Sequence, residues 1–191
     1  MRKVKFVFIH HGETKWNKEG KFQGQLDSPL TEKGREQIKE AAEKLRDISF
    51  DSIITSDLGR ALQSTEIIKN ILGIDKIEKD KKVRERRMGV LQDKRIEEVR
   101  RLFPHLFNQE GKINFEKEIP QAETLEDFLK RVESFLEDLK LRSGEKNIIV
   151  VTHEGVIQAV VSLVSEISFK EVSHLHFKPQ EPVFFSSGAI A

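Results

Sequence analysis

The side chains best suited to chemistry in this sequence lie where two apolar segments end. The segment 4–14 begins Val-Lys-Phe-Val-Phe-Ile and turns polar at His10 and His11, which are followed by Gly-Glu-Thr. A second apolar segment, 148–152, ends at His153. A neutral imidazole can attack phosphorus and carry the phosphoryl group as a covalent intermediate. Histidines at such positions can also be structural, so their meaning depends on the rest of the chain.

Arg60 would add the positive charge that phosphoryl chemistry needs. It lies in the first turn of a helix predicted from about Leu58 to Leu72, where the helix dipole disfavours a cation. That position is tolerable when the guanidinium reaches an anion, and an arginine can donate to two phosphate oxygens at once. The alternative is a solvated surface arginine. The chemistry also needs a carboxylic acid that protonates the leaving oxygen and then activates water.

Apolar runs without alternation predict the buried strands of a largely parallel sheet. Amphipathic segments between them predict helices, with Thr31 and Thr124 as N-caps of two of these. The alternation indicates an α/β fold with three layers, α/β/α, around a mainly parallel sheet. Parallel strands end at one edge, where such folds bind ligands. We therefore expect His11, Arg60 and His153 to converge.

The remaining segments are less regular. The expected order is a long loop at 15–30, a strand at 52–55, a short edge strand within 74–83, a short helix at 94–103, an insertion or lid at about 101–123, and edge strands at 171–177 and 182–185. Nothing in the sequence separates two domains, so we predict a single domain over 1–191.

Composition limits the classes of function. The chain has 191 residues, 37% hydrophobic and 34% charged, with a formal net charge of +1. The near-neutral balance argues against nucleic-acid and membrane partners. The absence of cysteine excludes disulfides, thiol catalysis and cysteine-ligated metals. No segment is typical of a transmembrane helix or a signal peptide, so we expect a cytoplasmic protein.

Four blocks of residues extend the pattern. They are His11-Gly12-Glu13-Thr14 with Trp16-Asn17, Gln23-Gly24, Asp27, Pro29-Leu30-Thr31 and Gly34; Ser56-Asp57-Leu58 with Arg60-Ala61 and Gln63-Ser64-Thr65; Arg84-Glu85 with Gly89; and Val151-Thr152-His153-Glu154-Gly155-Val156-Ile157. Together and in this order they closely resemble the signature of the histidine phosphatase superfamily, which has the phosphoglycerate mutase-like fold. The blocks cover most of the chain apart from 101–122 and the tail.

The resemblance implies a role for each residue of the site. His11 would be the phosphorylated nucleophile, Glu85 the general acid and base, and His153 a group that stabilises the transferring phosphoryl charge. Contacts to the substrate would come from Arg60, Asn17, Gln23 and Gly24. The family needs no metal for the chemistry, because arginine and imidazole supply the positive charge, and we expect no cofactor for this chain. The expected partner is a small-molecule phosphate ester, and a homodimer is compatible with the sequence.

One position departs from the family pattern. The family has arginine immediately before the nucleophilic histidine, where this chain has His10. Imidazole is shorter than guanidinium, has fewer donors and is only partly charged near neutral pH. Losing a preorganised donor typically lowers the rate about 100- to 1000-fold.

Three interpretations of His10 follow. The chain is an active phosphatase with a re-tuned pocket, compensated by a basic residue such as Arg84 or Arg87; or it is a poorly active relative that binds phosphorylated ligands; or His10 is an engineered or sporadic change. All three interpretations keep a phosphate contact through Arg60 and the imidazoles.

The short segment between Glu85 and His153 favours a phosphatase. The mutases that interconvert phosphoglycerates carry a longer insertion there, whereas a more open pocket lets water reach the phosphohistidine. The length resembles the broad-specificity, α-ribazole-5′-phosphate and metal-independent phosphoserine phosphatases of the family; the alternative is a cofactor-dependent phosphoglycerate mutase. Apolar residues of the insertion would either wall an apolar leaving group or pack inward as core: Phe103, Leu106, Phe107 and Phe115.

His174 and His176 are the remaining candidates for a site. Two positions apart on a strand, they would share one face and could ligate a metal. The sequence offers no third ligand nearby, so we predict no metal there. His105, beside Pro104, is expected to be an exposed loop residue.

Overall fold

The computed structural model describes residues 5–108, 111, 113–115, 117–142, 147–186 and 190, so Val4 and parts of the predicted insertion lie outside the described residues. Within them, five strands form one sheet in the order β3-β2-β4-β1-β5. The strands are β1 (Lys5–His10), β2 (Ser52–Thr55), β3 (Ile77–Lys79), β4 (Asn147–Thr152) and β5 (Val183–Ser186).

The sheet is parallel except at one edge. β1 and β2 each run parallel to β4, and β3 runs parallel to β2, whereas β5 is antiparallel to β1. The pairing of β1 with β4 ends at His10 and Thr152. Just beyond it, the N–H of His11 donates to the carbonyl of Thr152 at 3.0 Å. The two histidine turns therefore start side by side, at the edge where parallel strands end.

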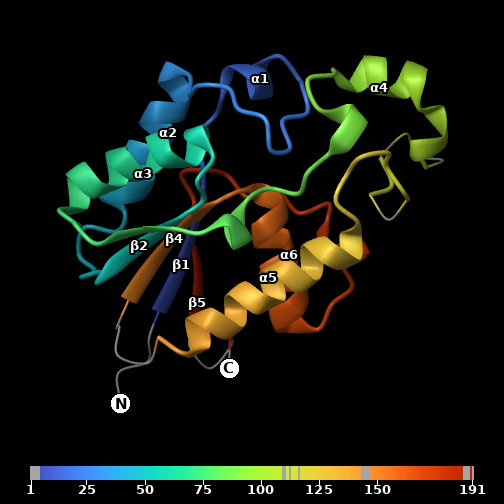
Figure 1. The fold of residues 1–191 in the computed structure, drawn as a ribbon. Helices are drawn as coiled ribbons and strands as arrows, with labels where there is room; N and C mark the ends of the chain where they lie inside the picture. The colour runs from blue at the N-terminus through green and yellow to red at the C-terminus, as the bar shows by residue number, and fades with distance from the viewer. Residues whose placement is uncertain are drawn as a thin grey trace.

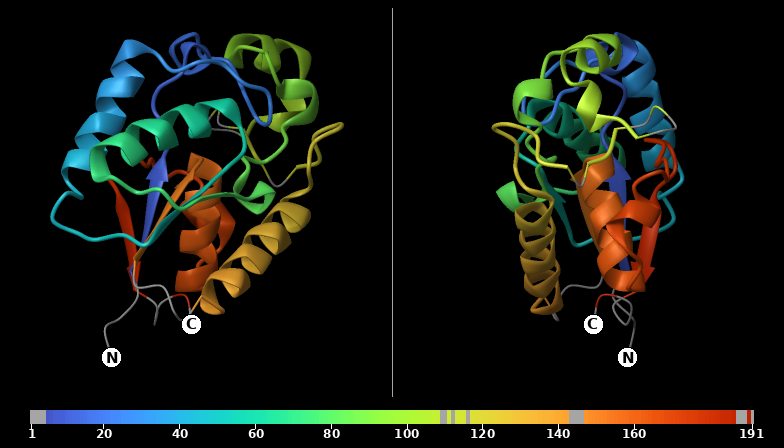
Figure 2. Two further views of the ribbon diagram at one scale, coloured as in Figure 1. Left: turned by 60° about the vertical axis from the view of Figure 1, so that its left-hand side comes forward. Right: turned by 90° about the vertical axis from the view of Figure 1, so that its right-hand side faces the viewer.

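Helices cover both faces of the sheet, which gives the predicted three-layer α/β/α fold (Figures 1 and 2). Helices α2 and α3 pack on one face, and α5, α6 and α7 pack on the other. Their bounds are α2 (Glu32–Glu43), α3 (Gly59–Leu72), α5 (Leu125–Lys140), α6 (Glu154–Ser165) and α7 (Phe169–Val172).

Side chains along the central strands point alternately into two hydrophobic cores, one on each face of the sheet. β1 places Val7 and Ile9 against α2 and α3, and Phe6 and Phe8 against α5 and α6. Successive side chains of a strand point to opposite faces, so a fully apolar strand is what a sheet with two covered faces requires. The buried apolar run that opens the sequence is explained by this double contact.

The helix ends follow local capping chemistry. The Thr31 hydroxyl accepts the N–H of Gly34, and the Thr124 hydroxyl accepts the N–H of Asp127. These bonds satisfy N–H groups that have no partner within the helix. At the C-terminal end of α3, Gly73 adopts a φ of 67°, the left-handed conformation that is typical of the residue after a helix.

A third, smaller hydrophobic cluster lies beside the end of the sheet. It is built around Met88, Leu91, Val99, Leu106 and Ile119. In Figure 1, α4 lies beyond the end of the sheet, to the right of α1. The short elements there and nearby are α1 (Lys15–Lys18), η1 (Lys81–Val83), η2 (Gly89–Leu91), α4 (Ile96–Leu102) and η3 (Pro104–Leu106).

Two expectations about local structure are wrong. The predicted loop 15–30 begins with the short helix α1, whose N-cap is Thr14. The predicted edge strand 171–177 is instead the end of α7 followed by an irregular segment. Its backbone groups bond to side chains: Gln158 Nε2 donates to the carbonyls of Ser173 and Leu175, and Glu154 accepts the N–H of Phe177.

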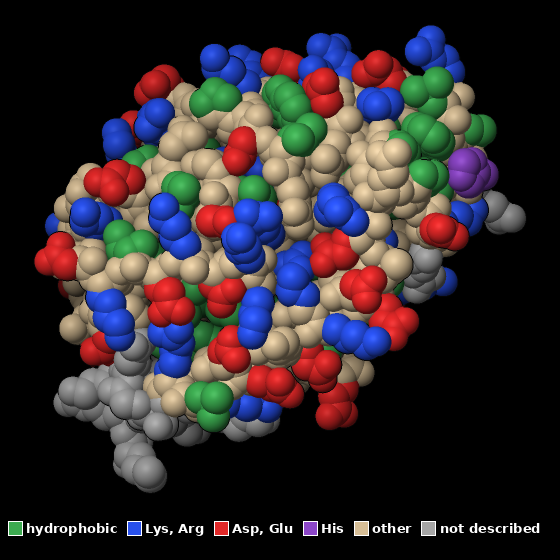
Figure 3. Space-filling view, viewed as in Figure 1, with side chains coloured by type: hydrophobic (Ala, Val, Ile, Leu, Met, Phe, Trp, Pro, Cys, Tyr) green, Lys and Arg blue, Asp and Glu red, His purple; other side chains and the backbone are tan. Residues whose placement is uncertain are grey.

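The surface carries mixed charge. On the face shown in Figure 3, positive and negative side chains are interspersed rather than gathered by sign. Among the described residues, no helix is both long enough and apolar enough to cross a membrane.

Candidate active site

A cavity of about 330 Å³ opens beside the ends of β1 and β4. We call its part around His11 and Arg60 the inner end. We call its part formed by Lys21, Phe22, Arg86, Met88 and Phe115 the outer wall. The other lining residues are His10, Asn17, Gln23, Gly24, Glu85, Phe128, Glu154, Gly155, Gln158, Phe169, Ser173 and His176.

His11 is held as a neutral imidazole whose Nε2 is unprotonated. Its Nδ1 lies 2.8 Å from the carbonyl of Gly12, so Nδ1 carries the proton and Nε2 keeps its lone pair. Burial, with the positive charge of Arg60 as a further cause, holds the pKa of His11 well below its usual range. The turn itself needs glycine, because a Cβ on Gly12 would meet the carbonyl oxygen of Gly34 at 2.3 Å.

Arg60 reaches the inner end from the first turn of α3. Its side chain is buried, and Nε donates to His11 Nε2 at 3.1 Å. Its Nη1 donates to the Leu26 carbonyl and to Asp27, and Nη2 donates to the Gly24 carbonyl. Asp27 also accepts the N–H of Arg60. The carboxylate explains how a buried cation is tolerated at a helix N-terminus.

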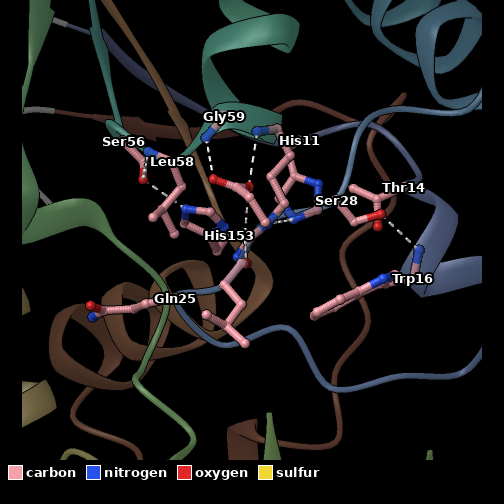
Figure 4. A network of polar contacts seen from close by, with 12 residues as sticks. His11, Thr14, Trp16, Gln25, Ser28, Ser56, Leu58, Gly59 and His153 are labelled. Atoms are coloured by element: carbon pink, nitrogen blue, oxygen red, sulfur yellow. Dashed lines mark hydrogen bonds and ion pairs between the residues drawn. The ribbon is translucent and has the colours of Figure 1, made fainter. Parts of the chain in front are cut away.

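His153 lies behind His11 and does not line the cavity. The two ring centroids are 5.1 Å apart, and His153 is fully buried. Its Nε2 lies 2.8 Å from the hydroxyl of Ser56, which also accepts the N–H of Leu58 (Figure 4). Burial holds the pKa of His153 well below its usual range. Its Nδ1 is buried and has no hydrogen-bond partner among the described residues.

Glu85 brings a carboxyl group to the cavity. Its Oε1 accepts the N–H of Arg86 at 2.8 Å, and its Oε2 accepts the N–H of Gly155 at 3.2 Å. A Cβ on Gly155 would lie 2.3 Å from Oε1, so only glycine permits this approach. Burial raises the pKa of Glu85 despite these bonds, which favours the protonated acid. The carboxyl can therefore give a proton and later take one back.

A family model described as the histidine phosphatase superfamily (branch 1) matches residues 6–182. The chain belongs to the histidine phosphatase superfamily. This confirms the resemblance seen in the four sequence blocks. A protein of Enterobacter sp. (strain 638) named "Probable phosphoglycerate mutase GpmB" is 36% identical over 169 residues, which cover 84% of this chain and 74% of that protein. A protein of the same name from Escherichia coli is 33% identical over 161 residues, with the same coverage.

Solved structures share the fold of this histidine phosphatase. YhfR of Bacillus stearothermophilus aligns with a TM-score of 0.86 at 26% identity, over 95% of this chain and 90% of that chain. The alpha-ribazole phosphatase of Shigella flexneri aligns with a TM-score of 0.81 at 22% identity, over 95% of this chain and 89% of that chain. The likeness confirms the phosphoglycerate mutase-like fold.

The sequence-predicted site residues of this histidine phosphatase come together in the structure. The nucleophile candidate His11, the acid candidate Glu85 and the clamp candidate Arg60 all line the cavity. The other residues expected to bind substrate line it too: Asn17, Gln23 and Gly24. Asn17 already uses its amide oxygen at the N-cap of α1, accepting from Thr14, so a ligand contact would come from its Nδ2. Within the part of the chain that the structure describes, the buried Oε1 of Gln23 has no hydrogen-bond partner.

His10 does not occupy the geometry of a phosphate clamp. It lines the cavity, but its Nδ1 lies 2.9 Å from the carbonyl of Phe177. That carbonyl can only accept, so Nδ1 carries the proton and Nε2 has a lone pair. Desolvation by burial lowers the pKa of His10. A neutral imidazole in this tautomer has no N–H left for a phosphate oxygen.

The residues suggested to compensate for His10 are not in place to do so. Arg84 pairs with both carboxylate oxygens of Asp57 at 2.6 Å, and neither Arg84 nor the exposed Arg87 lines the cavity. Arg86, between them, is buried and lines the outer wall. Its Nε donates to the carbonyl of Glu123 and its Nη1 to that of Phe115. The arginines at 84–87 predicted a basic residue at the cavity, but not that this residue is Arg86.

The insertion contributes less to the cavity than expected. Of its four apolar candidates, only Phe115 lines the cavity. Leu106 is buried in the third cluster, and Phe103 and Phe107 pack against that cluster. The sequence patterns did not predict a further set of lining residues: Lys21, Phe22, Met88, Phe128, Gln158, Phe169 and Ser173. Phe128 and Phe169 carry no distinguishing signal, because each also belongs to the main core.

The histidines of the tail do not form a metal site. The segment that carries His174 and His176 is not a strand, so the two side chains do not share a strand face. His174 is exposed and lies outside the cavity, whereas His176 lines it and contacts Glu154 at 3.3 Å. Within the described residues, no group of three or more His, Asp or Glu side chains is arranged to hold a metal. His105 is exposed, in η3.

Proposed function

We propose that this protein is a metal-independent phosphomonoesterase that hydrolyses a small phosphorylated metabolite through a phosphohistidine on His11. The observation that carries the proposal is the state of His11: Nδ1–H is bound to the carbonyl of Gly12, and Nε2 keeps a lone pair beside Arg60. A neutral, oriented imidazole next to a guanidinium is the arrangement that attack on phosphorus requires.

Two chemical steps follow from the geometry. First, His11 Nε2 forms a bond to phosphorus while the bond to the alcohol oxygen breaks, and Glu85 gives its proton to that oxygen. Second, water attacks the phosphohistidine, the phosphorus–nitrogen bond breaks, and Glu85 takes the proton from water. Arg60 stabilises charge on the phosphoryl oxygens. The phosphoryl charge also fits the unpartnered Nδ1 of the buried His153, provided that this nitrogen carries the proton.

Ser56 supports that protonation state of His153. The Ser56 hydroxyl accepts the N–H of Leu58 and has its own O–H left to donate. Donation to His153 Nε2, at 2.8 Å, puts the imidazole proton on Nδ1. The nitrogen without a partner is then a donor, and an anion would satisfy it.

The second candidate function is a cofactor-dependent phosphoglycerate mutase, as the relatives named GpmB suggest. The outer wall is compatible with it, because its two cations are only partly engaged. Lys21 pairs with Asp93 at 2.9 Å, and Arg86 donates to two carbonyls. Both keep N–H donors for a substrate carboxylate, so it is the short segment between Glu85 and His153 that favours hydrolysis. A weakly active phospholigand-binding protein stays a third candidate because of His10.

The deciding experiment is hydrolysis of p-nitrophenyl phosphate by wild type and His11→Ala in the presence of EDTA. We expect His11→Ala to lose at least about 10⁴-fold in kcat, as single nucleophile deletions do. The exposed His174→Ala serves as the matched control and should keep full activity. Unchanged turnover by His11→Ala would refute the mechanism.

Further assays separate the candidates. Transfer between 3- and 2-phosphoglycerate that depends on bisphosphoglycerate would identify a mutase. Thermal stabilisation by phosphate without turnover would identify a binding protein. A panel of phosphorylated metabolites, assayed without added metal, would name the substrate. A cytoplasmic location and a single domain stay predictions that cell fractionation and limited proteolysis can check.

A further inference from the structure

Arg131, on α5, uses every N–H of its guanidinium group within the chain. Two of them bind the carboxylate of Glu123, from Nε to Oε1 and from Nη2 to Oε2, both at 2.8 Å. The other three bind backbone carbonyls, those of Lys82 at 2.6 Å, Arg84 at 2.9 Å and Glu85 at 3.5 Å. Both side chains are largely buried, with Arg131 19% and Glu123 15% exposed.

Glu123 also holds the end of the segment 82–87, through its backbone and its carboxylate. Its N–H donates to the carbonyl of Arg87 at 2.9 Å, and its carboxylate accepts the N–H of Arg87 at 3.3 Å. Its carbonyl accepts Nε of Arg86 at 2.9 Å. The segment 82–87 is therefore held by Arg131 through three of its carbonyls and by Glu123 at its end.

This segment carries the catalytic acid and has little regular structure of its own. η1 ends at Val83 and η2 begins at Gly89, so residues 84–88 lie between two short 3-10 helices. The Glu85 carboxyl is directed by two backbone N–H groups, of which that of Arg86 belongs to the same segment. A shift of the segment would therefore move the acid and one of its two guides together, away from Gly155.

We propose that Arg131, paired with Glu123, is a positioning residue for Glu85: it fixes the backbone of 82–87 and so aims the Glu85 carboxyl at the oxygen of the leaving alcohol. A planar guanidinium with five fixed donors can hold a carboxylate and three carbonyls at once, whereas an ammonium group cannot. The inference rests on the proposed function, in which Glu85 is the acid.

The test uses leaving groups that differ in their need for a proton. p-Nitrophenolate departs readily as an anion, whereas the alkoxide of an alkyl phosphate must be protonated as it leaves. The ratio kcat/KM covers the steps up to release of the alcohol, so it isolates this proton transfer. A residue that merely stabilises the fold would change kcat/KM equally for both esters.

Arg131→Lys is the main variant, and Glu85→Gln is the benchmark for loss of the acid. We expect Arg131→Lys to lower kcat/KM about 100-fold for an alkyl phosphate, the effect of a displacement of about 1 Å at the reacting group, and by no more than a few-fold for p-nitrophenyl phosphate. Glu123→Gln, which keeps the shape and removes the charge, should show the same selectivity to a smaller extent. Lys130→Met, at an exposed pair with Glu126 on the same helix, is the matched control and should change neither rate.

A double variant completes the test. If Arg131 acts through Glu85, Arg131→Lys should cost nothing further on alkyl phosphates once Glu85→Gln is present. Equal losses on both esters, or additive losses in the double variant, would overturn the positioning role while leaving the proposed function intact. No selective loss in Glu85→Gln itself would overturn both, because Glu85 would not be the acid. Retained p-nitrophenyl phosphate activity shows in the same assay that each variant is folded.

Discussion

The inner end and the outer wall of the cavity are built in different ways. At the inner end, His11 follows β1 and Arg60 comes shortly after β2, and His153, behind His11, follows β4. Glu85 is the exception, because it comes from the irregular segment between η1 and η2. The outer wall comes from segments between elements, joined by bonds from side chains to backbone, such as that from Arg86 to the carbonyl of Phe115. The sheet thus fixes where phosphorus would react, and irregular segments fix what surrounds the alcohol.

The difference shows how reaction and substrate choice can be encoded separately. A change at the inner end disturbs groups that the sheet positions with little freedom, and it should affect every substrate. A change in the outer wall alters contacts to one part of one kind of substrate. Three substitutions test this division, from the largest expected effect to the smallest.

Arg60→Met should give the largest loss. It removes the donor on His11 Nε2 and leaves the carbonyls of Gly24 and Leu26 without their partner. We expect kcat/KM to fall about 100- to 1000-fold for all phosphate esters alike. Steady-state kinetics on p-nitrophenyl and 1-naphthyl phosphate measures this, and Arg35→Met on α2 is the control for loss of an arginine. A loss confined to one ester would contradict the division between the two ends.

His10→Arg should give an intermediate gain. An arginine at this position can donate to phosphate oxygens, so we expect kcat/KM to rise about 10- to 100-fold, less than the full effect of a preorganised donor. Inhibition by inorganic phosphate should strengthen in parallel. An unchanged rate would mean that another group already supplies the missing contact.

Phosphate binding by wild type and phosphate binding by His10→Arg should depend on pH in different ways. Because burial lowers the pKa of His10, wild-type His10 is neutral at pH 7 and gains an Nε2–H donor only as pH falls through that lowered value, below 6.5. The phosphate dissociation constant of wild type, divided by that of His10→Arg, should therefore fall toward one as pH falls, and taking the ratio cancels the ionisation of phosphate itself. A ratio that already falls above pH 7 would refute this tautomer argument, because wild-type His10 would then gain its Nε2–H donor above its usual pKa.

Phe115→Ala should have the smallest effect. Loss of part of an aromatic contact at the outer wall should raise KM for 1-naphthyl phosphate about 3- to 10-fold and leave kcat unchanged. Phe107→Ala is the matched control, because Phe107 packs on the third cluster rather than in the cavity. It should lower the denaturation midpoint without changing KM. If Phe115→Ala weakened inhibition by inorganic phosphate as much as it raised KM for 1-naphthyl phosphate, the outer wall would also affect phosphate binding at the inner end.

Sequence patterns were sufficient for the parts of the fold that depend on short-range signals. The strand at 52–55 was predicted with its observed bounds, and the Thr31 and Thr124 caps were placed at the observed helix starts. Convergence of His11, Arg60 and His153 followed from one rule about parallel strands. These features depend on residues close together in the chain or on the direction of a strand.

The features that were missed depend on contacts between distant residues. The tail 171–177 was predicted as an edge strand, but its carbonyls are taken by Gln158 and His10. No sequence pattern predicted a role for Arg86 or Arg131, and only the structure shows the carbonyls that they hold. A side chain that bonds to the backbone of a distant segment leaves no periodic pattern in the sequence.

The bond from Arg60 Nε to His11 makes anion binding at this N–H an exchange rather than a simple addition. The Nε–H is already occupied by the lone pair of His11, and in the proposed mechanism that same lone pair is consumed when the imidazole attacks phosphorus. The reaction would thus release the donor at the moment when a phosphoryl oxygen can accept it. A small anion that cannot react must instead compete with His11 for that N–H. The pairing should therefore discriminate reacting phosphate esters from inert anions, and weak inhibition by sulfate would be its signature.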